Sequence, residues 1–135
     1  MYGSTGFIVQ IMTNEIDTST ALKLGINILN KWKCTNTQIA TILGFCDNTF
    51  QNFYGDAKCP TLTTEQLERL SYIVNIHAAL NTTFSNSENV YGFMSMENQN
   101  EFFNGRTPLS VIYEESSSIH SLRAVCRRIE GMSDR

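Results

Sequence analysis

Apolar residues recur along this chain at the three- and four-residue spacing that is typical of amphipathic helices. In the first such segment the apolar positions are Ala21, Leu22, Leu24, Ile28, Leu29 and Trp32. The same analysis predicts helices over residues 18–32, 35–44, 47–54, 64–84, 87–96, 108–115 and 118–130. The pattern therefore predicts an all-α fold, in which short connections join the helices.

Polar residues at the predicted helix ends support this assignment. Thr35 with Gln38, and Thr63 with Gln66, have the spacing of a capping box, in which each side chain bonds the backbone N–H of the other. Gly44 follows the last apolar residue of the short helix and tolerates the positive φ of a sharp exit. Two helix starts and one helix end are thus fixed by local chemistry.

Two later segments stand out in the same way. The segment 64–84 carries apolar residues on more than one narrow stripe, which predicts a central helix packed on two sides. Thr107 followed by Pro108 is a favoured helix opening, since proline suits the first helical position. We expect the C-terminal half to pack around the central helix.

Composition narrows the class of protein. The chain has 135 residues, 41% of them hydrophobic and only two of them prolines, which suits one helical domain or two small ones. The apolar run 7–12 is too short to span a bilayer, so we expect a cytoplasmic protein without a membrane partner. The four cysteines form no metal-binding spacing and are interpreted as reduced thiols.

Nothing in the sequence indicates catalysis. The two histidines, His77 and His120, are isolated from each other, and the serines at 116–118 have no base placed beside them. No glycine-rich phosphate loop occurs. We therefore expect a binding protein with no catalytic residue, no metal and no cofactor.

The first half has the pattern of a helix-turn-helix. Ala40 is small enough for a close crossing, Gly44 makes the turn, and Phe50 and Phe53 lie in the next helix. That second helix would enter the DNA major groove. The candidate DNA-binding residues are Asn48, Thr49, Gln51, Asn52 and Lys58. The pattern alone fits a plain helical hairpin equally well. Because a net charge of −3 is unfavourable for a large DNA contact by one chain, it favours a dimer that adds two modest contacts.

The second half offers candidate protein contacts. Phe102 and Phe103 precede Asn104-Gly105-Arg106, and three further arginines lie near the C-terminal end at 123, 127 and 128. The candidate partner-binding residues are Phe103, Asn104, Arg106, Arg123, Arg127 and Arg128. A capped interhelix turn and a solvated basic surface are the simpler interpretations of the same residues, and both remain open.

Taken together, these motifs resemble a known family. The segments 29–32 and 38–44 look like the opening of Xre-type antitoxins with a C-terminal toxin-binding domain, the Xre/MbcA/ParS group. The segment 66–73 is similar to the central helix of that family, and 89–94 with 103–109 fits its second half. The resemblance covers about residues 20–130.

The resemblance implies a domain organisation and a function. It divides the chain into a flexible tail over 1–15, an Xre-like helix-turn-helix region over 16–62 and a helical toxin-binding domain over 63–135. The expected partners are a RES-domain toxin, which consumes NAD or transfers ADP-ribose, and operator DNA. We expect a type II antitoxin that blocks the toxin and, with it, represses its own operon as a homodimer or larger hetero-oligomer.

One departure keeps other functions open. The proposed recognition helix carries Asp47, Asn48 and Asn52 where such helices commonly have basic residues. A stand-alone helix-turn-helix regulator without a toxin is the first alternative. An interaction adaptor that no longer reads DNA is the second. For the antitoxin, arginines 123, 127 and 128 are the expected contacts to the toxin cleft, because a cleft shaped for an anionic dinucleotide should accept cations.

Overall fold

The computed structural model describes residues 17–46, 61–114 and 119–133, and these ranges contain six α-helices, one short 3-10 helix and no β-strand. In chain order the elements are α2 (Thr18–Lys31), α3 (Asn36–Leu43), α4 (Thr64–Thr83), α5 (Ser87–Gly92), the 3-10 helix η2 (Phe93–Ser95), α6 (Pro108–Glu114) and α7 (Ile119–Ser133). The all-α prediction is confirmed for the part of the chain that the structure describes.

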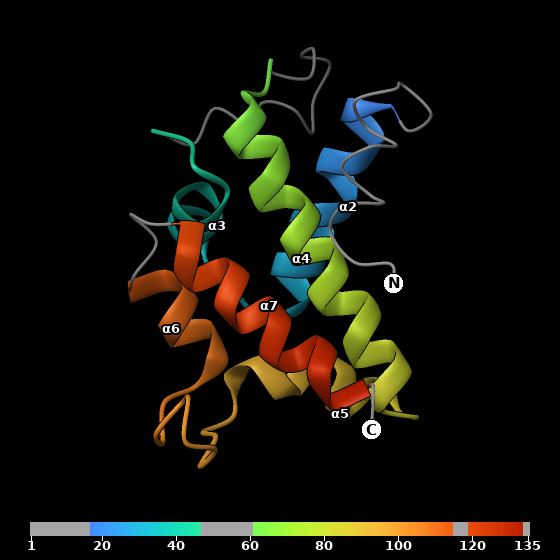
Figure 1. Cartoon of the computed structure of the whole chain (residues 1–135). Helices are drawn as coiled ribbons and strands as arrows, with labels where there is room; N and C mark the ends of the chain where they lie inside the picture. Colours follow the sequence, from blue (N-terminus) through green and yellow to red (C-terminus); the bar gives the residue numbers. More distant parts are fainter. Residues whose placement is uncertain (1–16, 47–60, 115–118, 134–135) are drawn as a thin grey trace.

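Helix α4 forms the middle of the molecule (Figure 1). It packs against α7 on one side and α2 on the other, and it also contacts α3 and α5. Arg69, Ser71, Tyr72, Ile73 and Ile76 are all buried, which is more than a single apolar stripe of a helix would bury. The prediction of a central helix packed on two sides is therefore confirmed.

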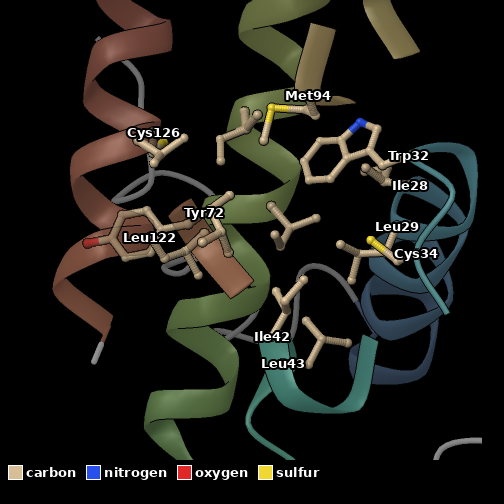
Figure 2. Packing of buried hydrophobic residues seen from close by; sticks show 14 of the residues in the cluster. Ile28, Leu29, Trp32, Cys34, Ile42, Leu43, Tyr72, Met94, Leu122 and Cys126 are labelled. Atoms are coloured by element: carbon tan, nitrogen blue, oxygen red, sulfur yellow. The ribbon is translucent and has the colours of Figure 1, made fainter. Parts of the chain in front are cut away.

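The core fills the space on both sides of α4 (Figure 2). Between α4 and α7 lie Leu122, Cys126 and the ring of Tyr72, while Trp32 and Met94 lie on the α2 side. Trp32 has no exposed surface and is the largest of the fully buried side chains. Burial of these apolar side chains is the main force that holds α2 and α7 against α4.

The predicted caps are present at the starts of α3 and α4. The Gln38 N–H donates to the Thr35 hydroxyl at 3.1 Å, and the Thr35 N–H donates to the Gln38 side chain at 2.8 Å. Thr63 and Gln66 make the same pair of bonds with the same two lengths. Both capping boxes are therefore confirmed, and each satisfies backbone donors that the first helical turn leaves unpaired.

Two glycines are required by geometry. Gly44 ends α3 with φ 86°, the left-handed conformation that was expected there. Gly25 lies where α2 and α4 approach closely, and a Cβ atom at this position would overlap the side chain of Leu70. The distance between α2 and α4 is thus set by a residue without a side chain.

The observed helix ends differ from the prediction by more than one residue in two places. The helix expected over 87–96 ends at Gly92 and continues as η2, whose Met94 is fully buried. Glycine is a poor helix former, and the tighter turn follows at once. Helix α7 extends to Ser133, three residues beyond the expected end at 130. The expected tail over 1–15, the proposed recognition helix over 47–54 and the serines at 116–118 lie outside the described residues.

No helix in the described ranges is both long enough and apolar enough to cross a membrane.

Replacing Thr63 by alanine should lower the free energy of unfolding by about 1 kcal/mol, because the Gln66 N–H loses its acceptor at the start of the central helix. Urea denaturation followed by circular dichroism measures the change. The control is Thr64→Ala, which alters an exposed threonine one position further on and should stay within about 0.5 kcal/mol of the native chain. Equal losses in the two variants would contradict the role of the cap.

Candidate functional site

The described part of the predicted helix-turn-helix region is anchored to α4 at the end of α3. Nη1 of Arg69 donates to the carbonyl of Ile42 at 3.3 Å, and Nε2 of Gln66 donates to the carbonyl of Gly44 at 3.1 Å. These bonds satisfy carbonyls that a helix C-terminus leaves without a partner. The direction in which the chain leaves α3 is therefore fixed by α4.

Arg69 is buried, with 4% of its surface exposed, and sequence reasoning did not find it. Its guanidinium pairs with Glu65, with both Nε and Nη2 lying 3.0 Å from the carboxylate. A buried cation needs such pairing, since an unpaired one would be costly. The spacing of Glu65 and Arg69 by four residues on one helix was the available sequence signal, but it does not reveal the contact with α3.

The proposed recognition helix cannot be placed against this anchor. Its candidate DNA-binding residues Asn48, Thr49, Gln51, Asn52 and Lys58 all lie outside the described residues.

A compact turn over residues 97–107 precedes α6. The Asn98 N–H donates to the Arg106 carbonyl at 3.1 Å, and the Gly105 N–H donates to the Asn98 carbonyl at 2.8 Å. Asn104 and Gly105 both have positive φ, 53° and 84°. Asparagine and glycine are the residues that adopt this conformation most readily, so backbone geometry alone accounts for the Asn-Gly pair.

The side chain of Arg106 holds this turn together. Its Nε donates to the Phe103 carbonyl at 2.9 Å, and its Nη2 donates to the Phe102 carbonyl at 3.3 Å. The guanidinium therefore lies on the turn that contains it. Part of its hydrogen-bonding capacity is used inside the chain.

Phe102 and Phe103 have different positions in this turn. Phe103 is only 2% exposed and belongs to the core, while Phe102 is half-buried. Their rings meet edge to face, with centroids 4.9 Å apart. Phe103 thus packs under the turn in the core, and the ring of Phe102 is partly exposed to solvent.

Arg128 of α7 lies over Phe102, with its guanidinium carbon 4.8 Å from the ring centroid. This is the geometry of a cation–π contact. Arg106 bonds the backbone of the same Phe102, so two of the predicted partner-binding arginines, from separate elements, meet at one aromatic residue. We call Phe102, Arg106 and Arg128, with the neighbouring exposed Arg127, the arginine surface.

Arg123 has a different environment. Its Nε donates to the Tyr72 hydroxyl at 2.8 Å, and its Nη2 pairs with Glu68 at 3.1 Å. The hydrogen bond to Tyr72 and that to Glu68 raise the pKa of the Arg123 guanidinium above its ordinary value. Arg123 is therefore a link between α7 and α4, and its charge is balanced by Glu68.

The titratable side chains form no recognisable metal site. Within the described ranges, no three histidine, cysteine or acidic residues lie close enough together to hold a metal ion. Cys34, Cys46 and Cys126 are free thiols, and burial raises the pKa of the Cys34 thiol to about 11.

His77 belongs to α4 and lies where this helix packs against α5. Its ring stacks on Tyr91 with centroids 5.4 Å apart, and its Nε2 lies 3.1 Å from the side-chain nitrogen Nδ2 of Asn81. Burial lowers the pKa of His77 below its ordinary value of 6.5, because the charged ring is poorly solvated there. The neutral ring is thus the form that the fold favours.

Replacing Arg106 by methionine should lower the free energy of unfolding by about 1 kcal/mol, since two hydrogen bonds to the turn are lost. The matched control is Arg127→Met, which removes the same charge from an exposed position of α7 and should change stability by less than about 0.5 kcal/mol. Urea denaturation gives both values. If the two variants are equally stable, Arg106 does not hold the turn.

His77 should titrate with a midpoint below 6.5, as measured from its ring proton by NMR and assigned from the spectrum of His77→Gln. The folded pKa lies below the unfolded one, so the stability that comes from the neutral ring is present above 6.5 and is lost as the pH falls through the folded midpoint. A midpoint at or above 6.5 would contradict the burial of this ring.

Comparison of the chain with protein-family models, with curated proteins and with solved structures finds no match. The motifs of the sequence and the contacts described above are what support a functional proposal.

Proposed function

We propose that this protein is the antitoxin of a type II toxin–antitoxin pair. Its C-terminal half binds and blocks a RES-type toxin that consumes NAD or transfers ADP-ribose. Together with that toxin, the helix-turn-helix region binds operator DNA and represses the operon. The observation that carries the proposal is the meeting of Arg106 and Arg128 at Phe102, because this exposed cationic surface brings Arg106, which lies in the 103–109 segment of the family resemblance, together with an arginine of the C-terminal helix.

The chemistry of the arginine surface suits such a partner. A toxin cleft that holds a dinucleotide must attract the negative charge of a pyrophosphate, and a cationic side chain can also approach acidic groups at its rim. Arginine and aromatic residues are enriched where interfaces have their strongest contacts. A cation stacked on Phe102 is partly ordered before binding, so less side-chain entropy is lost when the complex forms.

The structure ranks the candidate arginines. Arg123 is balanced by Glu68, and Arg106 is bonded to the turn, whereas Arg127 and Arg128 are exposed and have no carboxylate partner among the described residues. Arg127 and Arg128 are therefore the residues that we assign to direct contact with the toxin. Arg106 and Arg123 hold the turn and α7 in place behind them.

The DNA-binding part of the proposal depends on the anchor at α3. Because Arg69 and Gln66 fix the end of α3, the segment that follows starts from a defined position and direction. A helix-turn-helix needs this, since its second helix must enter the groove at a set angle. The first half is neutral, with four lysines and four acidic residues over 1–62, so a dimer or a toxin complex would supply the additional phosphate contacts.

The first test is co-expression with the product of the adjacent gene, followed by co-purification and an assay of NAD consumption. The double variant Arg127→Glu/Arg128→Glu should raise the concentration needed for half inhibition by at least about tenfold, because the two glutamates would be repelled by the acidic groups at the rim of the cleft. The control Lys23→Glu/Asn27→Glu/Asn30→Glu makes the same change of net charge at exposed positions of α2 and should inhibit like the native chain.

Point variants are sharper here than a deletion from Ser117 onward. Such a deletion would remove α7, whose Leu122, Val125 and Ile129 are buried, and would expose the core. Circular dichroism of both variants checks that they remain folded. If the neighbouring protein forms no complex and no NAD chemistry is found, the toxin-binding proposal is wrong.

The DNA-binding part has its own test. Binding to the upstream region of the operon is measured at several salt concentrations, with and without the toxin. A complex that binds more tightly than the chain alone, with a salt-dependent affinity, is expected for joint repression. Tight binding by the chain alone, in the absence of any toxin partner, would favour the stand-alone regulator instead.

A further inference from the structure

A groove separates the C-terminal end of α2 from α5 and η2, away from the arginine surface. It has a volume of about 890 Å³, within the usual range for small-molecule sites, and is lined by Lys31, Lys33, Ser87, Glu88, Tyr91, Gly92 and Ser95. The side chains of Lys31, Lys33 and Ser95 are exposed, so the groove is open to solvent. None of these residues belongs to the arginine surface.

The floor of the groove is ordered by aromatic contacts. Tyr91 is half-buried and stacks on His77, which is itself held by Asn81. The ammonium of Lys31 lies 5.3 Å from the centroid of the Tyr91 ring, a cation–π distance. One of the two lysines is therefore already positioned above the floor.

Both lysines lack an anionic partner. Neither makes a salt bridge to a carboxylate of the described residues, and Glu88 is the sole acidic residue in the lining. The groove thus carries an excess of positive charge on a chain whose net charge is −3. The hydroxyls of Ser87 and Tyr91 add neutral hydrogen-bond donors to the same lining, while that of Ser95 donates to the Trp32 carbonyl at 3.5 Å.

The backbone at Lys33 is unfavourable for a lysine. Its φ is 69°, in the left-handed region where glycine or asparagine is the usual choice. The conformation is held by bonds from the Lys33 N–H to Asn30 and from the Cys34 N–H to Leu29, while Trp32 and Cys34 on either side are buried. These two bonds are those of a common helix C-terminal motif, in which the residue after the C-cap adopts the left-handed conformation, so the charged side chain of Lys33 leaves a defined backbone position at the edge of the groove.

We propose that this groove binds a small phosphorylated molecule. Lys31 and Lys33 hold the phosphate as two point charges, and the hydroxyls of Ser87 and Tyr91 donate to its remaining oxygens. Glu88 accepts from a hydroxyl group on the organic part of the ligand. The groove joins α2 of the first half to α5 of the second, so an occupied site holds the two halves together. This site does not depend on the proposed antitoxin function.

The test uses inorganic pyrophosphate as the probe, titrated into the full-length chain at constant ionic strength so that general screening stays unchanged. NMR should show saturable shifts of the Tyr91 and His77 ring signals. Lys33→Gly should raise the pyrophosphate dissociation constant by about tenfold or more, because one of the two cations is lost. It should also raise the midpoint of thermal unfolding, because the left-handed backbone no longer carries a side chain.

The opposite changes in binding and stability separate a ligand site from a general loss of structure. Lys23→Gln is the control, since it removes a lysine from the same helix outside the groove lining, and it should bind pyrophosphate like the native chain. Absence of saturable shifts at Tyr91 and His77, shifts confined to the arginines of α7, or unchanged binding by Lys33→Gly would each overturn the proposal.

Discussion

Helix α4 buries side chains on both of its sides, and α2, α3, α5 and α7 all take their positions from contacts with it. On one side Gly25 lets α2 approach until it touches Leu70, and on the other Tyr72 and the apolar residues of α7 close the core. Arg69 and Gln66 of the same helix bond the end of α3. A change in α4 therefore reaches the end of α3 and the position of α7 together.

The five described arginines show how one residue type is used in two ways. Arg69, Arg106 and Arg123 bond carbonyls, a carboxylate or a hydroxyl of the chain itself, and they fix the end of α3, the turn before α6 and the contact of α7 with α4. Arg127 and Arg128 remain exposed. Arg106 is exposed as well, but its bonds to the turn fix its position, so the positive charge that a partner meets is better defined in position than the number of arginines suggests.

Features that depend on neighbouring residues were predictable from the sequence. The caps at Thr35 and Thr63, the left-handed Gly44 and the proline that opens α6 follow from bonds or sterics within four residues. The helix starts were accordingly found almost to the residue. The all-α class followed from the same local patterns together with the apolar spacing.

Contacts between distant segments were not predictable in this way. Arg123 meets Tyr72 and Glu68 across more than fifty positions, and Arg69 meets Ile42 across twenty-seven. Sequence reasoning grouped Arg123 with Arg127 and Arg128 as candidate partner-binding residues, but the acid that neutralises Arg123 lies on another helix. The groove was missed for the same reason, since its two walls come from α2 and α5.

Trp32 is the single tryptophan of the chain, and in the sequence it stands between the two lysines of the groove. Its side chain is fully buried, and its indole nitrogen has no hydrogen-bond partner among the described residues. An indole in such dry surroundings emits at short wavelength, and its emission moves to the red when water reaches it. The intrinsic fluorescence of this protein therefore comes from one known place, the contact between α2 and the elements around Met94. Any event that loosens this contact is visible in the native chain without a label.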